Sequence, residues 1–128
     1  MPGARILDVG QCGFDHGSIA RFLKKVYGAE VTGADTAGEA LATLRAGGFD
    51  LVLVNRLFDG DGSPGVALIR TIKADPDLAN LPVLLVSNYP EAQAEAQTLG
   101  ALAGFGKADL RAGKPLASID AALATKES

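Results

Sequence analysis

The sequence predicts an α/β fold, a single doubly wound domain in which a parallel β-sheet is covered by helices on both faces. A chain of 128 residues suits one domain and leaves little room for a second. Short β-rich runs alternate with apolar residues at helical spacing, which indicates parallel strands joined by right-handed crossovers. The run 51–54 is apolar throughout, as expected for a central strand buried on both faces. We therefore expect one domain over residues 1–128, with a short flexible tail at about 125–128.

Five segments are predicted to be strands because they are short, apolar and bounded by turn residues. They are 5–9, 30–34, 51–54, 82–87 and 102–105. Asp8 is the exception in the first strand, because an unpaired charge in a buried strand is costly. Either this strand ends earlier, or Asp8 has a partner such as Arg5 or Lys107.

Five helices are predicted from apolar residues at helical spacing and from end signals. We expect the first helix to end at Gly28, the fourth to start at Asn88 or Tyr89, and the fifth to begin at Pro115. A capping box over 36–39 marks the start of the second helix, and Asp75 followed by proline ends the third. The side chains expected to face the sheet are Ile19, Phe22, Leu23, Val26, Ala37, Ala40, Leu41, Leu44, Leu68, Ile69, Ile72, Leu116, Ile119 and Leu123.

Composition and charge exclude several classes of function. Apolar residues make up 48% and charged residues 21%, which is ordinary for a folded soluble domain. The net charge of −3, with no basic block, argues against nucleic acid as a partner. Cys12 is the single cysteine, so an internal disulfide is excluded and a reducing compartment fits. No signal peptide and no membrane-length apolar run is present, so we expect a cytoplasmic protein with no membrane partner.

Polar residues follow the predicted strands at the edge where doubly wound sheets carry their sites. In such sheets the functional crevice lies beyond the carboxyl ends of the strands. The residues to consider there are Gly10, Gln11, Cys12 and Asp15 after the first strand, Asn55 after the third, Ser87 after the fourth and Lys107 after the fifth.

Three segments, 49–55, 82–87 and 100–107, resemble the receiver domain of two-component response regulators. The resemblance covers nearly the whole chain and implies a flavodoxin-like sheet with strand order 2-1-3-4-5. In that family an acidic pair after the first strand holds Mg²⁺, and an Asp after the third accepts a phosphoryl group from a histidine kinase. A Ser or Thr and a Lys contact the phosphate. By position, the resemblance assigns the last two roles to Ser87 and Lys107.

The residues that carry the family's chemistry are replaced in this sequence. Gly10 and Gln11 stand in place of the acidic pair, and Asn55 stands in place of the phosphoacceptor. An amide oxygen is a weak nucleophile that cannot yield an acyl phosphate, and Mg²⁺ needs hard anionic oxygens. The aromatic residue that moves on activation in the family falls on Gly104, and the proline after the lysine falls on Ala108.

Two loops are expected to be longer than in the family. Gly65 comes ten residues after Asn55, which is two more than the family spacing. The first loop is expected to be longer as well, so that Asp15 either re-enters the pocket from an extended loop or forms the N-cap of the first helix.

Other site hypotheses have less support. Cys12, Asp15 and His16 supply at most three metal ligands of mixed softness. The segment 59–63 begins like a calcium loop but lacks its invariant Gly and its bidentate Glu, so a solvated turn is the simpler interpretation. The glycines of 10–13 lack the lysine of a P-loop and the third glycine of a dinucleotide fingerprint. We expect no metal and no cofactor.

The predicted function is that of a stand-alone pseudo-receiver, a non-enzymatic signalling domain that acts by protein contact without aspartate phosphorylation. The expected partner is a signalling protein, either a histidine kinase or an output protein. A homodimer through the fourth helix, fifth strand and fifth helix is also expected from the resemblance. Two alternatives stay open: a phosphoacceptor that uses Asp15 or Asp59, and a small-ligand sensor built on the crevice.

Overall fold

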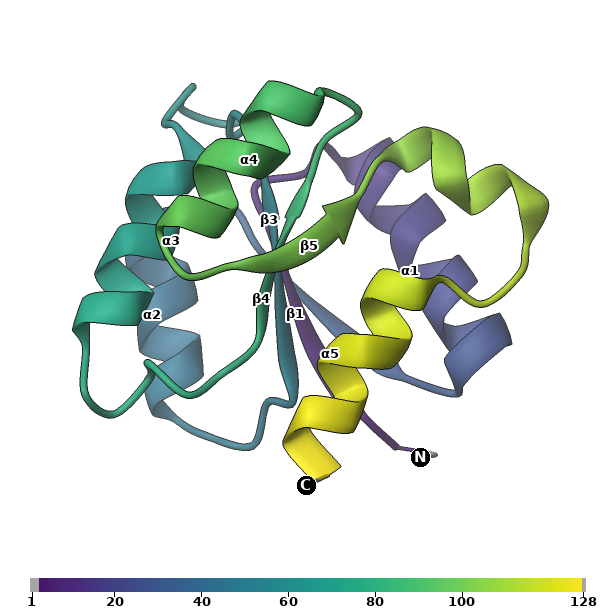
Figure 1. Ribbon diagram of the computed structural model, residues 1–128, viewed down its shortest axis with the longest axis horizontal. Coiled ribbons are helices and arrows are strands. Elements are labelled where there is room, and N and C mark those ends of the chain that lie inside the picture. Colours follow the sequence, from purple (N-terminus) through teal and green to yellow (C-terminus); the bar gives the residue numbers. More distant parts are fainter. Residues whose placement is uncertain (1–2, 128) are drawn as a thin grey trace.

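The computed structural model describes residues 3–127, in which strands and helices alternate (Figure 1). The strands are β1 (Arg5–Val9), β2 (Glu30–Ala34), β3 (Leu51–Asn55), β4 (Val83–Val86) and β5 (Leu102–Phe105). The helices are α1 (Gly13–Tyr27), α2 (Ala37–Arg45), α3 (Gly65–Ala74), α4 (Pro90–Thr98) and α5 (Ala117–Glu127), with a short 3-10 helix, η1 (Lys107–Ala112), before α5.

The strands form one parallel sheet in the order β2-β1-β3-β4-β5, so the predicted fold and strand order are confirmed. In register, Ile6 of β1 lies opposite Val31 of β2 and Leu51 of β3. The pairing of β4 with β5 is irregular, because a bulge separates the Leu84 and Val86 pairs. The sheet therefore has an irregular edge strand next to α4 and α5.

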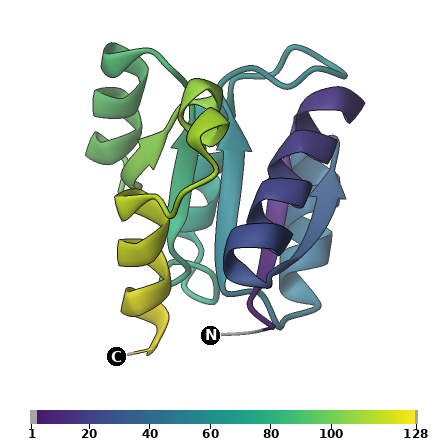
Figure 2. The ribbon, with the colours of Figure 1, turned by 90° about the vertical axis from the view of Figure 1, so that its right-hand side faces the viewer.

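Helices cover both faces of the sheet, with α1 and α5 on one side and α2, α3 and α4 on the other (Figures 1 and 2). Alternate strand residues face the two layers, as the period of a β-strand requires. Ile6 and Leu53 pack under α1 and α5, while Leu7 and Val54 pack under the other three helices. Every helix side chain that the sequence placed against the sheet is buried or partly buried in one of these clusters.

Most predicted helix ends are confirmed by their caps. Gly28 ends α1 in the left-handed conformation, with φ of 64°. The Thr36 hydroxyl accepts a hydrogen bond from the Glu39 N–H at 3.2 Å, which is half of the predicted capping box. Tyr89 precedes Pro90 at the first turn of α4. No helix among residues 3–127 is long and apolar enough to cross a membrane.

Two expectations about boundaries are wrong. The first loop is not extended, because α1 begins at Gly13 with Cys12 as its N-cap. The fifth helix begins at Ala117, after η1, and not at Pro115; just before it, the Leu116 N–H donates to the Tyr27 hydroxyl. The tail expected at about 125–128 stays a prediction, since α5 is assigned as far as Glu127 and Ser128 lies outside the described residues.

Candidate functional site

A polar cavity of about 230 Å³ lies at the carboxyl ends of the strands, where the sequence predicted the site. It brings together Asn55, Ser87 and Lys107 from the ends of three neighbouring strands. Its remaining lining residues are Arg56, Leu57, Val86, Asn88 and Tyr89. The residues that follow β1 do not line it: Asp15 lines a neighbouring groove that also contains Lys107, and Gln11 lines a separate cavity.

Asn55, the last residue of β3, uses its side chain to hold backbone. Its Nδ2 donates to the Gly10 carbonyl at 3.0 Å and to the Leu57 carbonyl at 2.7 Å. Both amide hydrogens are therefore engaged, one with the end of β1 and one with the following loop. A carboxylate could not make these two bonds, because it has no hydrogen to donate. The Asn55 side-chain amide therefore stabilises the local backbone structure.

Phe58 occupies the space above Gly10. Gly10 has φ of 83°, and a Cβ atom there would collide with the Phe58 ring, which is 2% exposed. The loop is held in this position because the Asp59 N–H donates to the Gly10 carbonyl at 2.9 Å. A side chain at position 10 would need both a strained backbone and displacement of the ring. The space beside position 10 is consequently filled by an aromatic side chain.

The rest of the long loop after β3 forms a turn. The Phe58 N–H donates to the Ser63 carbonyl at 2.9 Å, and Leu57 and Pro64 form an antiparallel bridge. The Asp61 carboxylate accepts from the Ser63 N–H at 2.9 Å, which lowers the pKa of Asp61. Asp59 is exposed. This geometry is that of the solvated turn expected as the simpler interpretation of 59–63.

Asp15 reaches Lys107 across 92 residues of sequence. Its Oδ2 accepts from the Lys107 Nζ at 2.7 Å, and this hydrogen bond lowers the pKa of the Asp15 carboxyl. Asp15 approaches from the first turn of α1, and the N-cap is Cys12, whose Sγ accepts from the Asp15 N–H at 3.4 Å. The N-cap alternative for Asp15 is therefore wrong. The Lys107 ammonium group is thus paired with this carboxylate.

Ser87 and Asn88 stabilise the connections on the other side of the cavity. The Ser87 hydroxyl accepts from the Tyr89 N–H at 3.1 Å, just before α4 begins. The Asn88 Oδ1 accepts from the Ala108 N–H at 3.4 Å, a donor that the family's proline would lack. Both polar groups are therefore used within the fold.

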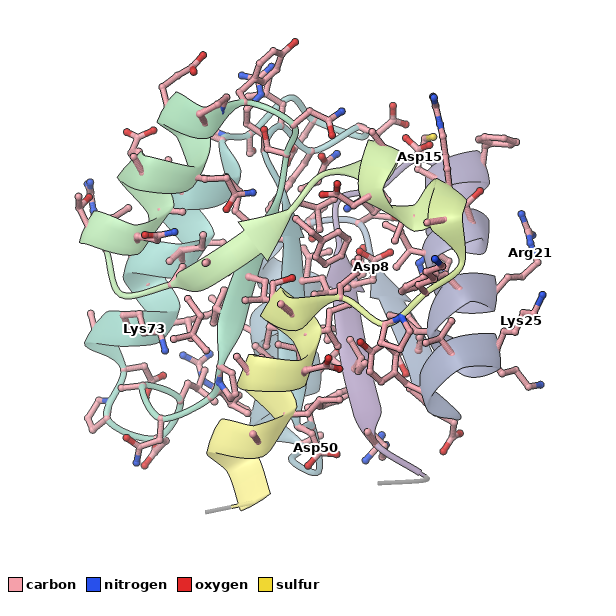
Figure 3. The ribbon with its side chains drawn as sticks, turned by 45° about the vertical axis from the view of Figure 1, so that its right-hand side comes forward. Asp8, Asp15, Arg21, Lys25, Asp50 and Lys73 are labelled. Carbon is pink, nitrogen blue, oxygen red and sulfur yellow. The ribbon has the colours of Figure 1, made fainter. Side chains whose placement is uncertain are left out.

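The buried carboxylate Asp8 pairs with His16, a partner that the sequence analysis missed. Asp8 lies in the interior (Figure 3) and is 1% exposed, while the His16 Nδ1 is 2.7 Å from its Oδ2. Desolvation raises the pKa of Asp8 to about 6, although His16 and, to a smaller extent, Gln11 and Lys107 oppose that rise. The predicted partners are wrong, because Arg5 bonds the 47–48 carbonyls and Lys107 bonds Asp15. The strand also does not end early, since β1 continues to Val9.

Gln93 of α4 bonds the backbone of both β4 and β5. Its Oε1 accepts from the Gly104 N–H at 3.1 Å, and its Nε2 donates to the Leu85 and Ser87 carbonyls at 2.9 and 3.1 Å. A Cβ atom at Gly104 would collide with Leu85 and with the Gln93 amide. The glycine therefore allows one side chain to join α4, β4 and β5.

Metal ligands do not gather in the described part of the chain. No three His, Cys, Asp or Glu side chains among residues 3–127 lie close enough to hold a metal ion. His16 contacts Asp8, whereas Cys12 caps α1, so these two candidates serve different local structures.

The position of one of these residues could have been predicted from the sequence, whereas the positions of two others could not. His16 precedes Ile19 and Leu23 at helical spacing, so a helix starting at Gly13 would have placed it on the buried face of α1. Phe58 and Gln93 gave no comparable signal, because their positions depend on contacts between elements distant in the sequence.

Comparison with known proteins identifies the class of fold. No family model matches the sequence. NtrX from Brucella abortus is 26% identical with a TM-score of 0.77, and the match covers 98% of this chain but only 28% of the NtrX chain. The signal receiver domain of a signal transduction histidine kinase from Syntrophus aciditrophicus is 23% identical with a TM-score of 0.68, covering 98% of this chain and 89% of that one. The chemotaxis protein CheY4 from Vibrio cholerae is 21% identical with a TM-score of 0.67, covering 81% and 84%.

The chain therefore has the fold of a response-regulator receiver domain, and its structural neighbours are receiver domains. This agrees with the resemblance seen in the sequence.

Proposed function

We propose that this protein is a pseudo-receiver, a signalling domain that acts through protein contact and is not switched by aspartate phosphorylation. The observation that carries the proposal is the engagement of Asn55: both hydrogens of its amide bind backbone carbonyls at the position of the family's phosphoacceptor. No carboxylate nucleophile is present at this position, and the Asn55 side chain is held in place by its two hydrogen bonds. The domain is accordingly a binding module without enzymatic activity.

The charge around the site supports the same proposal. Lys107 and Asp15 form an ion pair, so together they contribute no net charge. Gly10 and Gln11 contribute none, and Phe58 covers the glycine. A divalent cation without anionic ligands would lose its hydration without compensation. The site therefore has no means of neutralising a phosphoryl group with Mg²⁺.

The contacts that would transmit a conformational change from the site to the surface are also altered. In this chain Gln93 of α4 makes one hydrogen bond of 3.1 Å to Gly104 of β5 and two, of 2.9 and 3.1 Å, to the Leu85 and Ser87 carbonyls, and Gly104 leaves no aromatic ring to move. We infer that the face made by α4, β5 and α5 keeps one conformation, which suits constitutive binding.

Incubation with acetyl phosphate and Mg²⁺ should leave the intact mass of the protein unchanged. The physical reason is the weak nucleophilicity of the Asn55 amide together with the missing cation ligands. A receiver domain that retains its acidic pair and its acceptor aspartate is the positive control. Gain of one phosphoryl group, mapped by peptide mass to Asp15 or Asp59, would instead establish the alternative of a displaced phosphoacceptor.

Millimolar Mg²⁺ should leave the melting temperature and the amide NMR shifts of Gly10, Asn55 and Lys107 unchanged, because the site lacks net negative charge. Changing Gln11 and Asn55 together to Asp should introduce some cation sensitivity. Adding Gly10→Asp should not help, since that side chain would collide with Phe58 at a positive φ. Saturable shifts of these amides in the unmodified protein would contradict the charge argument.

The partner surface is proposed to be the face formed by α4, β5 and α5. Leu102 is 37% exposed on β5, next to a groove of about 500 Å³ between β5 and α5, and Glu91 and Glu95 are exposed on α4. A second copy of the chain or a histidine kinase or output protein would bury this edge strand. Asp120 of α5 accepts from the Tyr27 hydroxyl at 2.8 Å and so helps to hold α5 against α1.

Reversing the charges of Glu91, Glu95 and Lys114 should weaken self-association in sedimentation experiments and binding to a captured signalling partner. The matched control reverses Arg21 and Lys25, which point outward from α1 on another side of the molecule (Figure 3). If only the control variant loses binding, the interface lies instead at the groove of about 480 Å³ beside α1, where Phe14 is 78% exposed.

A further inference from the structure

Side chains of α1 and η1 line an open groove of about 480 Å³. The bordering part of α1 runs from Phe14 to Phe22, and the bordering part of η1 runs from Lys107 to Arg111. The groove shares two residues with the cavity that contains Asn55, whereas no described residue of α1 lines that cavity. Small-molecule sites typically have volumes of about 300–1,000 Å³. The groove therefore has room for a small organic ligand.

An aromatic ring is exposed at the α1 side of this groove. Phe14 is 78% exposed, which is the largest value for any large apolar side chain among residues 3–127. Leu110 of η1, which is partly buried, also lines the groove. A ligand with an aromatic ring would stack on Phe14 and remove apolar surface from water. The apolar part of the groove therefore favours a ligand with an aromatic ring.

The charged side chains of the groove carry an excess of positive charge. They are Asp15, Arg21, Lys107 and Arg111. Lys107 and Asp15 form the 2.7 Å ion pair described above, so their charges cancel. Neither arginine forms an ion pair with any residue in the described range 3–127. The groove thus holds two uncompensated positive charges, although the whole chain has a net charge of −3. Such a local concentration of charge attracts anions.

Arg21 lies on the same face of α1 as Phe14. The two residues are seven positions apart, with Ser18 between them at helical spacing. The Arg21 Nη2 donates to the Ser18 Oγ at 3.4 Å, and its Nη1 would lie 3.2 Å from a Cβ atom at Gly17. The guanidinium group therefore lies over the preceding turn of the helix, in the direction of Phe14. It has five N–H donors in a planar fork that fits phosphate and carboxylate groups, and this hydrogen bond engages one of them.

We propose that this groove binds, without covalent reaction, a small organic dianion with an aromatic ring, of the aryl phosphate class. The phosphate group interacts with the positive charges of Arg21 and Arg111, and the ring packs on Phe14. A phosphate monoester carries a charge of about −1.5 to −2 at pH 7, which matches the two uncompensated arginines. The inference concerns a different surface from the Asn55 cavity and does not depend on the proposed lack of aspartate phosphorylation.

The test is an NMR titration of the full chain with phenyl phosphate, in a phosphate-free buffer of low ionic strength near neutral pH. We expect saturable shifts at the amides of Phe14, Ser18 and Arg111, which belong to the two sides of the groove. The amide of Leu44 should not shift, because Leu44 of α2 packs on the opposite face of the sheet. Added sodium chloride should weaken the binding, since salt screens exposed charges.

Three further compounds separate the contributions of ring and charge. Inorganic phosphate has the charge without the ring, and phenol has the ring without the charge. Each should bind about 10-fold or more weakly than phenyl phosphate, because each lacks one of the two interactions. Benzylammonium combines the ring with a positive charge, and it should give no saturable shift because the two arginines repel it.

Variants then assign the binding to the proposed side chains. Arg21→Gln and Arg111→Gln should each raise the dissociation constant for phenyl phosphate about 10-fold, because each removes a charge-assisted interaction. Phe14→Ser should weaken phenyl phosphate but leave the affinity for inorganic phosphate unchanged. The matched control is Lys25→Gln, which removes an exposed positive charge one turn beyond Arg21 on α1 and outside the groove. All four positions are exposed, so these variants should fold as the unmodified protein does.

Four results would overturn the proposal. The first is the absence of saturation with phenyl phosphate, and the second is equal affinity for inorganic phosphate, which would mean that the ring is not recognised. The third is a set of shifts confined to Asn55 and Ser87, which would place the anion in the other cavity. The fourth is unchanged affinity in the two arginine variants, or an equal loss in Lys25→Gln, which would indicate a general effect of charge. None of these results changes the outcome of the acetyl phosphate experiment, so the two proposals fail independently.

Discussion

Replacing Leu53 by alanine should lower the free energy of unfolding by about 2–5 kcal/mol. Leu53 is fully buried in β3, opposite Asp8 of β1 and Leu84 of β4, and its side chain packs in the layer under α1 and α5. Truncation removes buried methyl groups and leaves a cavity that a sheet paired on both sides cannot collapse to fill. The loss would be a large part of the about 5–15 kcal/mol that stabilises a typical domain.

Urea unfolding followed by circular dichroism measures this effect. Leu102→Ala provides the matched control, because Leu102 lies on the edge strand β5 and is 37% exposed. It should lower the urea midpoint much less than Leu53→Ala. Equal midpoints for Leu53→Ala and the unmodified protein would contradict a central, doubly covered β3.

The second large effect expected is a dependence of stability on the ionisation of Asp8. Burial raises the pKa of Asp8 from 3.8 to about 6, so the folded protein holds this proton more tightly than the unfolded chain does. Its contribution to stability is fully present below about pH 4 and is lost as the pH rises through about 6. A difference of about 2 pKa units corresponds to about 3 kcal/mol.

Urea midpoints measured across this range for the unmodified protein and for Asp8→Asn should reveal the loss as a difference between the two curves. The amide of the variant does not ionise, so its curve retains only the contributions of the other groups. His16→Gln removes the side chain that opposes the rise in the pKa of Asp8, and its loss of stability should therefore extend to higher pH. Parallel curves for the unmodified protein and Asp8→Asn between about pH 4 and 7 would mean that Asp8 is not buried as described.

Elements whose evidence is local could be predicted from the sequence. The spacing of Ile19, Phe22 and Leu23 lies within one helix, so it specified the buried face of α1 without knowledge of any other segment. The parallel order of strands then placed Asn55, Ser87 and Lys107 at one edge, because carboxyl ends of parallel strands meet there.

The features that could not be predicted are contacts between residues of different helices, strands and loops. The sequence suggested Asp8 or a phosphate as the partner of Lys107, and the actual pairing with Asp15 follows from where α1 starts. Phe58 fills the space over Gly10 because the loop after β3 folds back, and Gln93 enters the bulge of β5 because Gly104 has no side chain. Each of these contacts needs three-dimensional positions that spacing along the chain does not contain.

The order of the strands has a consequence for synthesis on the ribosome. Translation produces β1 first, but one of its two neighbours in the sheet is β3, which ends at Asn55. The nascent chain must therefore expose the unpaired edge of β1 until β3 has emerged. An unpaired strand edge can pair with a strand of another chain, which leads to aggregation. Asp8 interrupts the apolar residues of β1, and a charge within a strand opposes that association. The carboxylate that destabilises the finished fold above about pH 6 is thus expected to keep the unfinished chain from aggregating.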